Sequence, residues 1–447
     1  MELSTSNILL IALYFVIVFA IGFWVRRKET VQEYLIAGRK IKLLQTTASI
    51  LAVVGGMVLV TQAALAYELG LAAAWYWVGA ALGLVCLGFA AKKIKIIADK
   101  NNFLTLSDYF FTKFDYKNGI LSAIILFIAF YALLVGQFIA AGSLFSPLLG
   151  IKYSTAVLVM GLGTLIYLVL GGFKAVIKTD FLQFIIMFFV FIFILSTINI
   201  GTYTPEQINI TSIGGPLIFI FLIIGIFIVF GAGDIWQRIF AAKDVKTIRN
   251  ASFLSAALFL IFGIVLTIIG IAAKNNFPDI NPSEALYYGM FYLIPTQLLG
   301  LSIIVLLAAI MSTIDTELFY LSSSISKDFI HRKKALSEEK MAKILRISII
   351  ILAAISALTA ILFTNIITIL FGILSLTLAI SPSIIASFFW KIKNNAVFLS
   401  MIGGLLGFIV LIATNNFNPD TSIITLPSAI LFLIIGQIIF KKQTAQI

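Results

Sequence analysis

Residues 301–328 read LSIIVLLAAIMSTIDTELFYLSSSISKD, and the two halves of this stretch differ in composition. The first half is almost pure hydrocarbon, whereas the second carries a Ser-Thr pair, acids and several more hydroxyl groups. Acids inside a membrane are costly and usually mark ion paths. The second half therefore either lies outside the membrane or supplies oxygen atoms that hold an ion.

The composition of the whole chain predicts a membrane protein. Of its 447 residues, 61% are hydrophobic and 11% are charged, whereas soluble domains carry about 25% charged residues. One crossing of the bilayer takes about 20 apolar residues. The sequence predicts an all-α polytopic protein with about 13 transmembrane helices, in one membrane domain over residues 1–447. The apolar runs lie near 7–25, 44–66, 68–91, 119–147, 152–171, 180–200, 215–233, 252–273, 295–318, 346–363, 366–390, 396–414 and 423–440.

The basic residues predict the orientation in the membrane. If the first span runs from outside to inside, 29 of the 31 Lys and Arg residues fall on the inner side, and only Lys152 and Lys274 fall outside. The positive-inside rule then places the N-terminus outside and the C-terminus in the cytoplasm. The formal charge of +12 is thereby explained by topology, and it does not indicate a nucleic-acid partner.

The sequence gives little indication of a metal cluster or of an enzyme active site. Cys86 is the single cysteine and His331 the single histidine, and they lie far apart in the chain. No thiolate metal site and no nucleophile–base arrangement follows from such a pattern. We therefore expect a protein that is not an enzyme.

The order and direction of the predicted helices indicate an inverted repeat. Five helices over 44–200 match five helices over 215–390 turned upside down. In transporters built this way, solute and ions bind near the middle of the membrane, where the first helix of each repeat is broken. Glycine also serves close packing of membrane helices, which is the alternative explanation. Candidate breaks in the two first helices are Gly55, Gly56, Gly225, Gly231 and Gly233.

Five motifs in order resemble the sodium:solute symporter family, which includes proline, pantothenate, sugar and sialic-acid transporters. They are EYLIAGRKI (33–41), AALAYELGLAAAWY (63–76), YLVLGGFKAVIKTDFLQ (167–183), GAGDIWQRIFAAKD (231–244) and AAIMSTIDTELFYLSSSISKD (308–328). The resemblance extends from about residue 33 to 392. It implies a ten-helix core, with an accessory helix at 7–25 before it and two helices over 396–440 after it. It also implies import of a small solute in symport with sodium.

The resemblance further implies a sodium site in the stretch quoted first. Residues three apart share a helix face, so the Ala309 carbonyl and the Ser312 hydroxyl point the same way, with Thr313 adjacent. The matching positions in the family bind sodium together with two carbonyls of the broken second helix, which here are those of Leu51 and Val54. The alternative is that both hydroxyls serve helix packing or bond to carbonyls of the preceding turn.

A second cation or proton site is implied by some relatives, in which an acid of helix six faces the same stretch. The corresponding residues here are Asp180, Asp315 and Thr316. Two carboxylates at one point either bind a cation or share a proton, because like charges at close range cannot both stay ionised. The alternative places Asp180 at the membrane interface, paired with Lys174 or Lys178.

Two further charged residues have weaker assignments. Arg238 is expected at the membrane interface, with Asp234 as its partner. Glu317 points away from the ion-binding face and receives no role.

The residues that line the substrate pocket are predicted around the break in helix two. Gly55 and Gly56 lie at the break, and Gln137 is an amide in an apolar helix that needs a partner or a ligand. Trp75 and Tyr76 are aromatic candidates, although they equally suit the aromatic belt at the outer interface.

The solute is expected to be a monocarboxylate, an amino acid or an analogue. Proline-transporting relatives carry an acid at the position of Val53, so proline itself fits less well. Two other functions stay open. One is a proton-coupled symporter of the same fold, and the other is a membrane module that senses a solute without transporting it.

Overall fold

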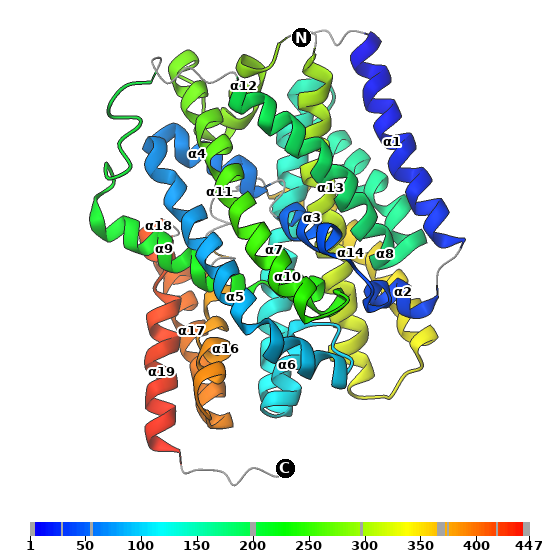
Figure 1. Cartoon of the computed structure of the whole chain (residues 1–447), viewed down its shortest axis with the longest axis vertical. Helices are drawn as coiled ribbons and strands as arrows, with labels where there is room; N and C mark the ends of the chain where they lie inside the picture. The colour runs from blue at the N-terminus through cyan, green and yellow to red at the C-terminus, as the bar shows by residue number, and fades with distance from the viewer. Residues whose placement is uncertain are drawn as a thin grey trace.

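The computed structural model describes residues 5–27, 30–53, 57–196, 203–295, 298–363, 372, 375–416 and 419–440. Over these ranges the chain is helical, and its β pairing is confined to an isolated bridge between Ile41 and Ala242 (Figure 1). The helices are α1 (Thr5–Arg26), α2 (Val31–Ile36), α3 (Leu43–Ala52), α4 (Met57–Leu69), α5 (Trp75–Lys100), α6 (Leu106–Lys113), α7 (Tyr116–Leu149), α8 (Tyr153–Ser196), α9 (Gly214–Gly231), α10 (Gly233–Ala241), α11 (Val245–Asn276), α12 (Ala285–Leu293), α13 (Leu299–Ser324), α14 (Glu338–Leu362), α16 (Ser381–Phe389), α17 (Asn394–Thr414), α18 (Pro419–Ser422) and α19 (Thr425–Ile439).

Within the described ranges, nine helical segments are long and apolar enough to cross a membrane. Two of them, Met57–Lys100 and Tyr153–Ser196, contain 44 residues each, which at about 1.5 Å per residue is about twice the thickness of the hydrocarbon core. Both change direction at a glycine with positive φ, Gly70 (+62°) and Gly172 (+49°). Each is therefore long enough for two crossings, and the total of 13 stays a prediction.

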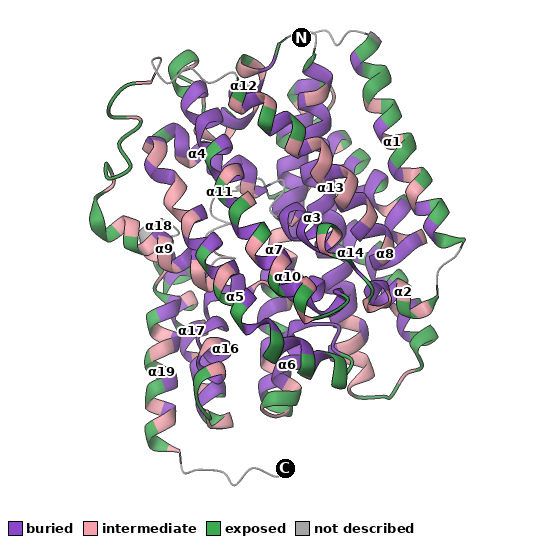
Figure 2. Ribbon diagram, viewed as in Figure 1, coloured by how far each residue is buried: buried purple, intermediate pink, exposed green. Residues whose placement is uncertain are grey.

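Helix α13 forms the centre of the bundle, and α1 lies at its edge. In the most apolar window of α13 94% of the residues are buried, against 22% in α1. Helix α13 packs against α1, α7, α8 and α14. The outward face of α1 is apolar, with Leu9, Val16 and Phe23 exposed (Figure 2). An apolar interior under an equally apolar outer surface is the arrangement of a polytopic helical membrane protein.

The C-terminal helices form a separate group beside α9. Helices α17 and α19 pack along each other, and α16 contacts α9, α17 and α19. In Figure 1 this group occupies the lower left, whereas α1 lies at the right edge. The central helices between these two groups therefore form the part of the fold in which the candidate site lies.

Two apolar segments of the bundle are interrupted. Helix α3 ends at Ala52, and α4 begins at Met57. Helix α9 ends at Gly231 and α10 begins at Gly233, with Ala232 extended between them (φ −78°, ψ 90°). Both α3 and α10 pack against α13. The two interruptions therefore lie beside the same central helix.

Candidate functional site

Backbone and hydroxyl oxygens of α3 and α13 meet where α3 ends. The hydroxyl of Ser312 lies 3.0 Å from the carbonyl oxygen of Ala52 and 3.0 Å from that of Ala309. Thr313 donates a hydrogen bond of 2.9 Å to the same Ala309 carbonyl. Carbonyls in the last turn of a helix lack an intrahelical donor, so the Ala52 oxygen is free for another partner. Such carbonyls, together with hydroxyls, suit a hard cation like sodium.

The carbonyl that contacts Ser312 differs from the two predicted ones. The sequence pattern predicts Leu51 and Val54, whereas the structure places the Ala52 oxygen against the hydroxyl. Leu51 is buried in the last turn of α3, and its role as a sodium ligand stays a prediction. Val54, Gly55 and Gly56 lie outside the described residues. Ala52 was missed because a ligand that acts through its backbone leaves no mark in the side-chain pattern.

A fully buried ion pair lies next to these oxygens. Asp180 of α8 accepts a hydrogen bond of 2.5 Å from Ser49 and lies 3.3 Å from the Nη2 atom of Arg238. Arg238 also donates to the Ser49 hydroxyl at 2.9 Å and to Thr316 at 2.5 Å. The guanidinium group therefore joins α3, α8, α10 and α13. The side chain of Arg238 is 0% exposed, and its position at the membrane interface stays a prediction.

The alternative explanation, in which Asp180 pairs with a neighbouring lysine, is wrong. Lys174 forms an ion pair of 2.9 Å with Glu33, and Lys178 lies 3.8 Å from the centre of the Trp24 ring. The physical reason is helix geometry. At about 100° per residue, Asp180 projects from nearly the opposite side of α8 to Lys178, and that side faces the centre of the bundle.

Asp315 is held separately from this ion pair. Its Oδ2 atom accepts a hydrogen bond of 2.6 Å from the hydroxyl of Tyr167, and its Oδ1 atom has no hydrogen-bond partner. The structure thus brings Arg238 against two of the three predicted second-site residues, Asp180 and Thr316. A positive charge of the protein itself lies where the sequence predicts a second cation. The role of the three residues as an ion site stays a prediction.

The predicted substrate residues fall into two places. The Oε1 atom of Gln137 accepts a hydrogen bond of 2.9 Å from the backbone nitrogen of Met57, at the start of α4. Trp75 donates to the carbonyl of Ile210 at 2.8 Å, and Tyr76 packs on the apolar cluster around Ile224. Gln137 is therefore beside the interrupted helix, whereas the two aromatic residues face α9 and the segment before it. Their assignment to a substrate pocket stays a prediction.

Comparison with known families identifies the group to which this arrangement belongs. The model of the sodium:solute symporter family matches residues 34–407, which is most of the chain. The chain belongs to the sodium:solute symporter family. Members of this family are transporters and not enzymes, and sodium is the ion to which their transport is coupled.

Individual relatives match this chain over nearly its whole length. The osmoregulated proline transporter OpuE of Bacillus subtilis (strain 168) is 26% identical, over 98% of this chain and 95% of the relative. The sodium/pantothenate symporter of Haemophilus influenzae is 29% identical, over 92% of this chain and 91% of the relative. A sodium-coupled sialic acid symporter, solved in a substrate-bound outward-open state, superposes with a TM-score of 0.80 at 18% identity, over 98% of this chain and 99% of that one. The structural likeness shows that the fold is shared.

Proposed function

We propose that the protein carries a small organic solute into the cell in symport with sodium, by alternating access. The observation that carries this proposal is the meeting of the Ser312 hydroxyl with the carbonyls of Ala52 and Ala309 at the end of α3. A sodium ion at this point would be coordinated by oxygen atoms of both α3 and α13 and would hold the two helices together. The solutes named for the relatives are proline, pantothenate and sialic acid. A monocarboxylate, an amino acid or an analogue is the corresponding class for this chain.

The proposed architecture is a pair of inverted repeats, 44–200 and 215–390, flanked by 7–25 and 396–440. The interruptions after Ala52 and at Ala232 support it, because each falls within the first helix of one repeat. Transporters with this architecture move by rocking one group of helices against the other around a central site. The distribution of Lys and Arg residues supports an external N-terminus and a cytoplasmic C-terminus.

Coupling follows if sodium binds better to one conformation than to another, because a ligand shifts a conformational equilibrium only by its difference in affinity. Sodium bound between α3 and α13 stabilises the conformation in which those helices are in contact. The inward sodium gradient then fills this site from outside and empties it inside. The solute bound at the neighbouring interruption moves with the ion.

Uptake into proteoliposomes tests the proposal, with sodium and proton gradients varied independently. Radiolabelled L-proline, pantothenate and sialic acid are the first solutes to measure. Uptake of one of them driven by a sodium gradient, and lost in the double variant Ser312→Ala and Thr313→Ala, supports sodium symport. Uptake that follows the proton gradient alone favours the proton-coupled alternative. Saturable binding without transport under any gradient favours a sensor.

A further inference from the structure

Glu317 is a buried acid that the sodium site and the Arg238–Asp180 pair leave unused. It lies on α13, and its side chain is 0% exposed. Both of its carboxylate oxygens are without a hydrogen-bond partner. The ion pairs found over the described ranges do not include it, and Arg238 is already engaged by Asp180. An acid inside a membrane that has no ion-pair partner among the described residues is a candidate for binding a ligand.

The surroundings of Glu317 place it between the two interrupted helices. The side chain of Gln137 on α7 lies beside it, yet the Gln137 Nε2 atom forms no hydrogen bond of normal geometry. The other end of that amide is fixed by the backbone nitrogen of Met57, where α4 begins. The charged groups that act on Glu317 are Asp234, in the first turn of α10, and Asp315. Both are acids, so they add negative charge.

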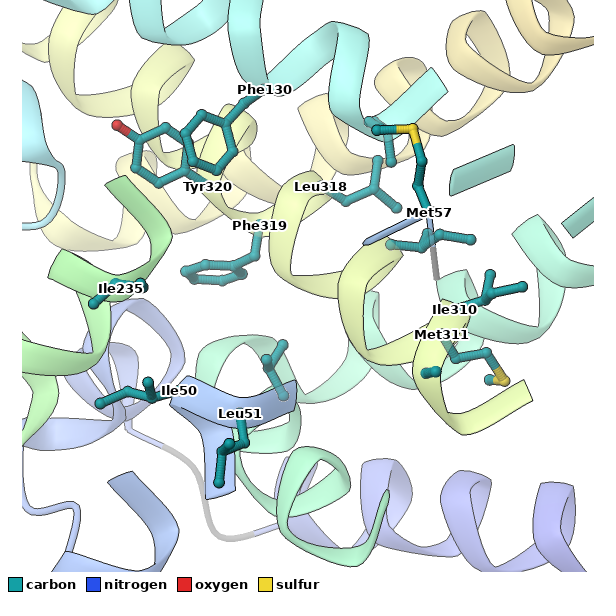
Figure 3. Packing of buried hydrophobic residues seen from close by; sticks show 14 of the residues in the cluster. Ile50, Leu51, Met57, Phe130, Ile235, Ile310, Met311, Leu318, Phe319 and Tyr320 are labelled. Carbon is teal, nitrogen blue, oxygen red and sulfur yellow. The ribbon is translucent and has the colours of Figure 1, made fainter. Parts of the chain in front are cut away.

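An aromatic pair lies near Glu317, in the direction in which α13 ends. Tyr320 lies one turn further along α13, and its ring centre is 4.3 Å from that of Phe130 on α7 (Figure 3). Phe130 in turn lies two turns before Gln137 on the same face of α7. By the register of α7 and α13, the rings lie nearer than Gln137 and Glu317 to the end of the bundle at which α13 finishes.

A vestibule lies further along α7, beyond Gln137. Its volume is about 430 Å³, and Val60, Ala140, Tyr153, Glu284 and Tyr287 are among the residues that line it, whereas Gln137 and Glu317 are not. Val60 lies one turn after Met57, and Ala140 lies one turn after Gln137. The vestibule opens near α12, which is the external end in the proposed orientation.

We infer that Glu317 is a specificity-determining residue that binds a positively charged amine of the transported solute, and that the Gln137 amide donates to an acceptor of the same solute. Burial of an ionised carboxylate is costly unless a cation pairs with it, and Asp234 and Asp315 add to the negative charge around Glu317. An organic cation needs only the one carboxylate, and the Gln137 amide lies next to that carboxylate.

The test uses pairs of solutes that differ only in the amine, since the inference rests on the proposed function and narrows its solute class. Suitable pairs are L-alanine with propionate, L-proline with cyclopentanecarboxylate, and L-phenylalanine with 3-phenylpropionate. Thermal unfolding of the purified full chain is measured in saturating sodium. We expect at least one amino acid to raise the unfolding temperature and its partner without the amine to leave it unchanged. Equal shifts within every pair, or no shift from any amino acid, would overturn the inference.

Variants then assign the effect to Glu317. Loss of one partner of a buried charge pair weakens binding by at least about 30-fold, so Glu317→Gln should raise the half-saturating amino acid concentration by that factor. Glu317→Asp should restore part of the affinity. Glu339→Gln, which removes an exposed acid on α14, should change nothing. Unaltered amino acid affinity in Glu317→Gln would overturn the inference.

A separate readout keeps this inference distinct from the transport proposal. Sodium alone, without solute, should stabilise the wild type and Glu317→Gln equally, because the oxygens of Ser312 and Ala52 are untouched. Retained sodium stabilisation with lost amino acid binding isolates the role of Glu317. Absence of sodium stabilisation in the wild type would count against sodium symport instead.

Discussion

The guanidinium group of Arg238 lies 3.3 Å from the carboxylate of Asp180, and neither side chain is exposed to solvent. The pair connects α10, which follows the interruption at Ala232, to α8. Ser49 and Thr316 bond to the same guanidinium from α3 and α13. One buried cation therefore links the two interrupted segments to the central helix.

Removing one member of this pair should destabilise the protein strongly. Breaking a buried ion pair leaves an uncompensated charge and costs about 3–5 kcal/mol. We expect Arg238→Gln and Asp180→Asn each to lower the unfolding temperature in detergent, and the double variant to lose less than the two losses added. Lys174→Gln is the matched control, because its pair with Glu33 is 25% and 21% exposed and is worth about 0–1 kcal/mol. Equal losses in Arg238→Gln and Lys174→Gln would disprove a structural role for the buried pair.

Ser312→Ala should weaken sodium binding while leaving the fold intact. A hydrogen-bonding group that contacts an ion contributes about 1.5–3 kcal/mol, so the half-saturating sodium concentration should rise about tenfold or more. The measurement is sodium-dependent thermal stabilisation of the purified chain. Ser302→Ala is the control on the same helix, since that buried hydroxyl has no hydrogen-bond partner. If the two variants Ser312→Ala and Ser302→Ala had the same half-saturating sodium concentration, Ser312 would not be a sodium ligand.

Tyr320→Ala should make transport leaky. The Tyr320 ring centre lies 4.3 Å from that of Phe130, and we propose that this pair separates the surroundings of Glu317 from the end of the bundle at which α13 finishes. Without the ring we expect solute efflux from loaded proteoliposomes to increase several-fold and sodium-driven accumulation to fall. Tyr320→Phe keeps the ring and removes a hydroxyl that has no partner, so its efflux should match the wild type. Equal efflux in Tyr320→Ala and Tyr320→Phe would show that this ring is not a barrier.

Gly225→Ala should disrupt the packing of α9 on α5. A Cβ atom at Gly225 would lie 2.4 Å from the carbonyl oxygen of Tyr76 and 2.5 Å from the backbone nitrogen of Ala80. Backbone atoms cannot yield as a flexible side chain does, so we expect a loss of about 1–3 kcal/mol in unfolding free energy. Gly215→Ala on the same helix meets nothing within 4 Å and should leave stability nearly unchanged. Comparable stability of the two variants would contradict this close approach.

Single-cysteine labelling should establish the orientation. Cys86 is the single cysteine of the chain, so Cys86→Ser provides a background without thiols. A cysteine introduced by Ser337→Cys, next to the basic residues before α14, should be protected from an impermeant reagent added to intact cells. One introduced by Asn209→Cys, in the exposed segment before α9, should react. Labelling in the reverse pattern would invert the proposed topology.

The helical nature of the chain and the second interruption could be predicted from local composition. Apolar runs of membrane length follow from the thickness of the bilayer. Gly231 and Gly233 flank Ala232, where α9 stops and α10 begins, so these two candidate glycines marked the position correctly. The third candidate, Gly225, was wrong, because it lies inside the continuous helix α9, where it packs closely against α5. Family membership could also be predicted, because the motifs that carry it are continuous in the chain.

The surroundings of Arg238 and Glu317 could not be predicted in the same way. The partners of Arg238 come from three helices distant in the sequence, and the rotation of each helix about its axis is determined by how it packs. An interface arginine and a buried one therefore have the same local pattern. Glu317 received no role because the stripe through Ser312 and Asp315 does not include it, and Gln137 reaches it from another helix.

The amino-acid sequence was sufficient for the class of protein and for the family, since these depend on composition and on motifs that are continuous in the chain. The carbonyl that meets Ser312 could be identified only in the folded chain. Ala52 and Ser312 are 260 residues apart, and a backbone oxygen becomes available only where its helix ends against another helix. That position depends on how α3 and α13 are placed relative to each other, which no local pattern records.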